Sequence, residues 1–119
     1  ARLLEAKGIS AAVINPRWIK PLDAATLEFF ARSVRLVCTM EDHVLLNGFG
    51  SAVLEHLNDA GIQTPVVRIG WPDQFIEHGS VDVLREKHGL TSRAACEKIL
   101  ARLHQNGAHS IKTTSGSAA

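Results

Sequence analysis

Residues 36–54 constrain the fold of this chain more than any other stretch. An apolar run at 36–40 leads into two acids at 41–42, and a short loop then reaches Gly48 and Gly50 before an amphipathic helical pattern begins. The two glycines allow a sharp backbone turn and let the start of the helix lie close to the preceding strand. The stretch therefore predicts a strand, a glycine loop and a helix, which form one α/β unit.

The rest of the chain alternates between strand and helix patterns in the same way. Apolar runs predict buried strands at 9–14, 36–40 and 65–69. Helices are expected at 1–7, from an Asp23 N-cap to about residue 34, at 50–60, from Ser80 to near Gly89, and from Thr91 or Ser92 onward. Strands that alternate with helices indicate an α/β fold with a mainly parallel sheet and helices on both faces, a three-layer α/β/α architecture.

Three of these helices carry an apolar stripe that predicts which face is buried. The stripes consist of Leu27, Phe30, Ala31 and Val34, then Val53, Leu54 and Leu57, and finally Ala95, Ile99, Leu100 and Leu103. After about residue 104 the composition becomes polar and small, with a single isoleucine. We therefore expect one domain over 1–103 and a disordered tail over 104–119.

Composition excludes several classes of protein. A chain of 119 residues with 45% apolar residues is long enough for one packed core, and a net charge of +1 with interspersed signs predicts no nucleic-acid surface. Apolar runs of about five residues are too short to span a membrane, and no signal-peptide pattern is visible. Cys38 lies in a predicted strand and Cys96 on a predicted helix, so both are expected to be buried thiols in a reducing cytoplasm.

Three motifs together resemble a known family. They are EDHVLLNGFGSAVL at 41–54, NPRWIKPLD at 15–23 and IGWPDQFIEHG at 69–79. With the spacing between them, they make residues 3–103 similar to the carboxy-terminal domain of transketolase-type thiamine-diphosphate enzymes, and most similar to that of the 1-deoxy-D-xylulose-5-phosphate synthases. The departures are Asn47, where the family commonly has glycine, and Trp18 and Trp71, where it has smaller or different apolar residues. Asparagine tolerates positive φ, so the loop is expected to keep its shape.

This resemblance implies a transferase of which the chain is a structural, interface-forming part. In the family, thiamine diphosphate and Mg²⁺ are held by the two preceding domains, and the parent enzyme condenses pyruvate with D-glyceraldehyde 3-phosphate and releases CO₂. The product feeds isoprenoid, thiamine and pyridoxal synthesis. The resemblance further implies a bacterial cytoplasmic homodimer in which this domain contacts the remaining domains, binds no cofactor itself and is inactive alone.

The glycine loop lies where α/β proteins bind anions, at a helix N-terminus after a strand. It is not a dinucleotide fingerprint, because the third glycine position falls on Val53, and no Lys-Ser/Thr pair follows for a nucleotide P-loop. Tight packing of helix on sheet is the structural alternative. We predict no catalytic, cofactor-binding or metal residue, and the candidate contacts for an anion or a neighbouring domain are Glu41, His43, Asn47, Gly48, Gly50 and His78.

The acid–histidine pairs have structural alternatives as well. Neighbouring residues on a strand point to opposite sides, so Glu41 and Asp42 are not expected to converge on one atom; one caps backbone N–H groups and the other faces solvent or a neighbouring domain. Six histidines are scattered without an H-x-x-x-H pair, which argues against a metal site. Trp18 and Trp71 flank prolines in loops, and one of them is expected at an interface.

Three alternatives remain open at this point: another thiamine-diphosphate enzyme (a transketolase or the beta part of a 2-oxoacid dehydrogenase), a free-standing α/β ligand-binding module, and a non-catalytic interaction protein derived from this domain.

A helix pattern at residue 1 of an α/β alternation further implies a strand before it. We therefore expect an incomplete domain with one open sheet edge, which either self-associates or is completed by a preceding segment.

Overall fold

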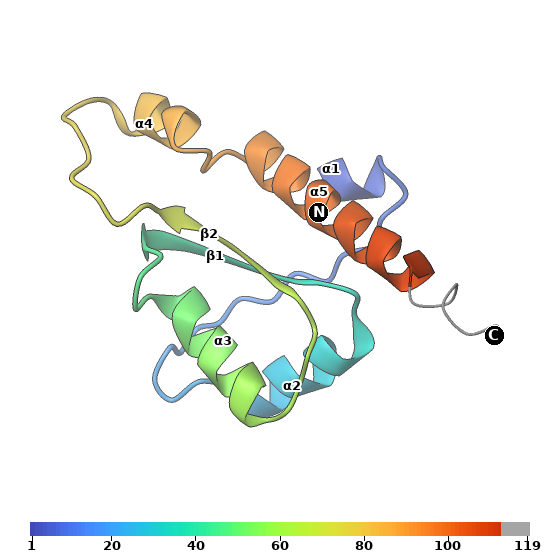
Figure 1. Cartoon of the computed structure of the whole chain (residues 1–119). Helices are drawn as coiled ribbons and strands as arrows, with labels where there is room; N and C mark the ends of the chain where they lie inside the picture. Colours follow the sequence, from blue (N-terminus) through green and yellow to red (C-terminus); the bar gives the residue numbers. More distant parts are fainter. Residues whose placement is uncertain (113–119) are drawn as a thin grey trace, which may run out of the picture.

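The computed structural model of the chain describes residues 1–112, which form five helices and a two-stranded sheet (Figure 1). Their order is α1 (Arg2–Glu5), α2 (Ala24–Ser33), β1 (Val37–Val44), α3 (Phe49–Asp59), β2 (Val66–Trp71), α4 (Val81–Lys87) and α5 (Ser92–Lys112). β1 and β2 are parallel, and their register runs from Val37 opposite Val66 to Val44 opposite Trp71, with an irregularity between Met40 and Val44. A parallel pair needs a crossover connection, and α3 supplies it.

Helices lie on both faces of the sheet, so the expected α/β/α layering is confirmed (Figure 1). On one face Ala31 of α2, Val53 and Leu57 of α3, and Ile62 just after α3 are buried, with Val37 and Val66 of the strands packed against them. On the other face α1 and α5 bury Leu4, Cys96, Ile99 and Leu103, with Cys38 of β1 against them. Burial of these apolar side chains is the main favourable term for a fold of this size.

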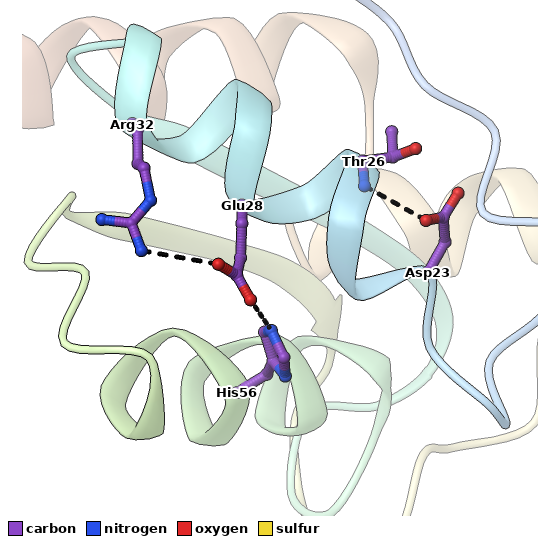
Figure 2. Close-up of polar contacts among 5 residues, drawn as sticks. All are labelled: Asp23, Thr26, Glu28, Arg32 and His56. Carbon is purple, nitrogen blue, oxygen red and sulfur yellow. Dashed lines mark hydrogen bonds and ion pairs between the residues drawn. The ribbon is translucent and has the colours of Figure 1, made fainter.

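Figure 2 shows the polar contacts of α2, one of which joins it to α3. Asp23 is the N-cap of α2 and accepts a hydrogen bond from the backbone N–H of Thr26 at 3.1 Å. Hydrogen bonding with Thr26, through its side chain first and its backbone second, lowers the pKa of Asp23. Glu28 on α2 lies 3.0 Å from Nε2 of His56 on α3 and 3.4 Å from Arg32. His56 first and Arg32 second hold the pKa of Glu28 below its ordinary value.

Most of the predicted elements are confirmed within a residue or two. The Asp23 cap, the helix after the glycine loop and the two helices from residues 81 and 92 all form, and the helices α3 and α4 are followed by Gly61 and Gly89 with φ of 66° and 71°. These left-handed conformations favour glycine and stop each helix. β1 extends four residues beyond the predicted strand, through the acidic pair to Val44.

The prediction of a buried strand at 9–14 is wrong. The segment is extended but unpaired within residues 1–112, and Val13 and Ile14 are 79% and 45% exposed. An apolar run becomes a strand only where a neighbouring strand accepts its backbone hydrogen bonds, and within residues 1–112 this segment forms no such ladder. Met40, expected in the interior, pairs with Ile69 across the sheet but is 59% exposed.

Two smaller expectations also differ from the structure. Leu54 was assigned to the buried stripe of α3, but it is 39% exposed because α2 contacts the stripe along Val53 and Leu57. α5 runs to Lys112, beyond the end predicted for its apolar stripe. A nucleated helix propagates through polar residues at little cost, and even glycine costs only about 1 kcal/mol. Residues 113–119 lie outside the described part of the chain, and the tail over 104–119 stays a prediction.

Candidate functional site

The carboxylate of Glu41 caps the N-terminus of α3. Its two oxygens accept hydrogen bonds from the backbone N–H groups of Phe49 at 2.7 Å and Gly50 at 2.9 Å. A helix N-terminus carries partial positive charge and unpaired N–H donors, which is why it attracts anions. In this chain the anion is a side chain of the preceding strand, so the first turn of α3 has its negative partner already.

Both glycines of the loop are required by close approach of other atoms. A Cβ on Gly50 would lie 2.6 Å from Oγ1 of Thr39 and 2.8 Å from Cδ of Arg68, and a Cβ on Gly48 would overlap the Glu41 carboxylate. Asn47, just before them, has a φ of 57°, the left-handed conformation that asparagine tolerates. The loop shape therefore serves the Glu41 cap and the packing of α3 on the sheet.

Arg68 of β2 binds the loop between β1 and α3. Its guanidinium donates to the carbonyl oxygen of Leu45 and to Oγ of Ser51, each at 2.9 Å, and the Ser51 hydroxyl donates to the same carbonyl at 3.0 Å. Strand β2, the loop and α3 are thus joined by one network of charge-assisted and neutral hydrogen bonds. Sequence reasoning missed this network because nothing in the spacing of residues 45, 51 and 68 indicates that they meet.

Asp42 points away from Glu41 and forms a second polar cluster. Its two oxygens accept from Nε1 of Trp71 at 2.7 Å and from the guanidinium of Arg85 on α4 at 2.9 Å. The Trp71 hydrogen bond first, and then Arg85, hold the pKa of Asp42 below its ordinary value. Glu41 therefore binds the start of α3, whereas Asp42 binds Trp71 of β2 and Arg85 of α4. In the sequence, Trp71 stood out as a tryptophan beside a proline, and it was the one signal that could have indicated this second cluster.

Four of the six candidate residues line one open cavity of about 740 Å³: Glu41, His43, Asn47 and Gly48. The cavity lies between the segment before α2 and the N-terminus of α3, and its apolar lining includes Ile19 and Met40, which are 55% and 59% exposed. Gly50 and His78 are not among the lining residues. An open hollow with exposed apolar side chains and a satisfied carboxylate has the character of a contact surface more than of an enclosed ligand pocket.

The two candidate histidines are not brought together. His43 lies exposed at the end of β1 with Nδ1 2.9 Å from the carbonyl oxygen of Val44. His78 is exposed in the loop between β2 and α4. Over the described residues, no group of three or more His, Cys, Asp or Glu side chains is arranged to hold a metal ion. No helix within residues 1–112 is both long and apolar enough to cross a membrane.

Comparison with known proteins assigns this geometry to a family. The family model for "Transketolase, C-terminal domain" matches residues 1–94. The chain belongs to this family. Among solved structures, a "Split gene transketolase, inactive beta4 tetramer" superposes with a TM-score of 0.80 and 38% identity, over 87% of this chain and 34% of that one.

Curated relatives within this family point to one enzyme. The chain is 61% identical over 100 residues to a 1-deoxy-D-xylulose-5-phosphate synthase of Methylacidiphilum infernorum (isolate V4), which covers 84% of the chain and 16% of the relative. It is 52% identical over 109 residues to the synthase of Acidobacterium capsulatum, covering 92% of the chain and 17% of that relative. The chain thus spans about one sixth of the length of these relatives.

The N-terminus of α3 does not fit the diphosphate group of thiamine diphosphate. The α3 N-terminus is the anion-binding position that the glycine loop offers, and the Glu41 carboxylate occupies it. A diphosphate brought to this point would face that negative charge instead of free N–H donors. No reaction step is therefore assigned to the described residues of this chain.

Proposed function

We propose that residues 1–103 are the carboxy-terminal domain of a 1-deoxy-D-xylulose-5-phosphate synthase and build its assembly without taking part in the chemistry. The observation that carries this proposal is the 61% identity over 100 residues to a relative with that name. The parent enzyme would condense pyruvate with D-glyceraldehyde 3-phosphate, release CO₂ and supply isoprenoid, thiamine and pyridoxal synthesis. Thiamine diphosphate and Mg²⁺ would be held by its other domains.

The domain would act through its surfaces. The cavity at the end of β1, with Ile19 and Met40 exposed beside Glu41 and His43, supports contact with the remaining domains of the parent polypeptide. Of the candidate contacts, His43, Asn47 and His78 present polar side chains for such an interface. Gly48, Gly50 and Glu41 shape the loop that presents them. The parent is proposed to be a homodimer in the bacterial cytoplasm.

A transketolase is the second candidate, favoured by the 38% identical solved neighbour whose title names one. The two candidates differ in substrate. A synthase with this domain forms deoxyxylulose phosphate from pyruvate and D-glyceraldehyde 3-phosphate, whereas a transketolase transfers a two-carbon ketol unit between sugar phosphates. Assaying the intact parent enzyme with both substrate sets separates them, and ketol transfer without use of pyruvate would overturn the synthase assignment.

The proposal that this domain holds no cofactor is tested on the isolated chain. Calorimetric titration of the isolated chain with thiamine diphosphate and Mg²⁺ is expected to give no binding, and the isolated chain is expected to form no deoxyxylulose phosphate. The physical reason is the capped α3 N-terminus. Micromolar cofactor binding to the isolated chain would contradict a domain without a cofactor site.

A further inference from the structure

The loop between β2 and α4 presents a phenylalanine entirely to solvent. Phe75 is 106% exposed, the highest exposure among the large apolar side chains of the described residues, and it lies in the family-like stretch at 69–79. Val81 and Val83 at the start of α4 are 55% and 64% exposed. In Figure 1 this yellow loop and α4 project beyond the strand ends, away from α2 and α3. Three exposed apolar side chains therefore lie on the loop and the helix that follows it, and exposed apolar surface of this kind marks interaction sites.

The loop that carries Phe75 is anchored at both ends. At its start Trp71 donates to Asp42 at 2.7 Å, and Arg85 of α4 binds the other oxygen of Asp42 at 2.9 Å. Further along, Glu77 pairs with Lys87 at the end of α4 and lies 3.5 Å from Nε2 of His88. The loop is therefore tied to the strand end and to α4 on either side of Phe75.

The contacts of Trp71 and Glu77 fix the loop on both sides of Phe75 but leave the Phe75 ring uncovered. Ordering a loop costs conformational entropy, and an interface whose loop is ordered in advance does not lose that entropy on association. Phenylalanine is also among the residues enriched at protein interfaces relative to the rest of the surface. A loop fixed on both sides of an exposed phenylalanine is thus suited to insert that ring into a pocket of another surface.

We propose that Phe75 is a docking anchor that inserts into an apolar pocket on the part of the parent polypeptide lying outside this chain. The proposal rests on the proposed function. Because the relatives are about six times longer than the matched region, the parent polypeptide contains other domains whose surfaces Phe75 can contact within the same molecule. Asp73 is exposed two residues away, whereas Glu77 is paired with Lys87. The pocket is accordingly expected to have a lysine or arginine at its rim.

Photo-crosslinking in the intact parent enzyme tests the proposal. p-Benzoylphenylalanine replaces Phe75 in one sample and Phe29 in a control, because Phe29 is also an exposed phenylalanine (70%) but lies on α2, remote in sequence from the anchored loop. After irradiation, cross-linked peptides are identified by mass spectrometry. We expect position 75 to give cross-links to peptides outside the 119 residues, at a yield at least several-fold above that of position 29.

The same preparations are assayed for deoxyxylulose phosphate formation, which keeps the two proposals separable. An active enzyme that gives no cross-link from position 75 would overturn the docking proposal alone. The docking proposal would also be wrong if position 75 cross-linked only to residues within the 119, in the same or a second copy. It would likewise be wrong if the cross-linking yield at position 75 equalled that at position 29. If the parent enzyme is inactive also without the substitution, while position 75 cross-links as expected, the proposed function is overturned and the docking surface stands.

Discussion

At the scale of single residues, the site is governed by how closely α3 approaches the sheet. Gly50 occupies the first turn of α3, where intrinsic helix propensity favours alanine over glycine by about 1 kcal/mol. The structure opposes this preference, because Thr39 Oγ1 and Arg68 Cδ would lie 2.6 and 2.8 Å from any Cβ. Thr39 is buried and Arg68 is held by Leu45 and Ser51, so neither side chain has free space to move into.

We predict that crowding outweighs propensity at this position. Gly50→Ala should lower the free energy of unfolding by roughly 1–3 kcal/mol, the usual cost of overpacking, and Gly50→Val by at least as much. Urea denaturation followed by circular dichroism measures the change. Gly79→Ala is the matched control, since its Cβ would meet only ordinary contacts at 3.5 Å from Leu84. If Gly50→Ala is as stable as the control variant, α3 does not pack closely against the sheet at this position, and the prediction is wrong.

At the scale of elements, hydrophobic period and capping residues predicted the helices, the two paired strands and the layering. These features are local: Asp23 caps within three residues, and the stripe of α5 repeats within the helix. The polar clusters of the site join residues far apart in sequence, such as Asp42 with Arg85 and Leu45 with Arg68, and no local pattern reports them. The unpaired segment at 9–14 was mispredicted for the same reason, because strand formation depends on a distant partner.

The ion pairs of Glu77 give α4 and its preceding loop a pH dependence. The Lys87 hydrogen bond, and to a smaller extent backbone bonding and His88, lower the pKa of Glu77 from 4.5 to about 2. A carboxyl group whose pKa is lower in the folded state stabilises the fold above its unfolded pKa and loses that contribution as the pH falls through the folded pKa. The contribution of Glu77 is therefore expected in full above about pH 5 and should fade between pH 4.5 and pH 2.

Carboxyl ¹³C NMR titration of Glu77 checks this prediction directly. The wild-type midpoint should lie near pH 2, and Lys87→Met should move it upward toward 4.5 because the main stabilising partner of the carboxylate is removed. Glu77→Gln should be less stable than wild type at pH 6, with a difference that disappears as the pH approaches 2. A midpoint that is the same with and without the Lys87 ammonium would show that the pair does not form in solution.

At the scale of the whole molecule, the sheet is open along one side of β1. Within residues 1–112, β1 pairs with β2 and with no other strand, and the extended segment at 9–14 is also unpaired. An exposed edge strand offers a row of backbone donors and acceptors that favours pairing with another strand. Met40 is 59% exposed on β1, so this edge has no charged side chain at that position to discourage such pairing.

We therefore predict that the isolated chain self-associates, and that in the intact parent enzyme another strand covers this edge. Analytical ultracentrifugation should show concentration-dependent association of the isolated chain. Met40→Lys should weaken it, because a lysine on an edge strand opposes strand addition, whereas Met40→Leu, which keeps the position apolar, should not. In the intact enzyme, hydrogen exchange should show protection of the β1 amides that lack a β2 partner. An isolated chain that stays monomeric with those amides already protected would mean that residues 1–119 close the sheet by themselves, and the prediction of an open edge would be wrong.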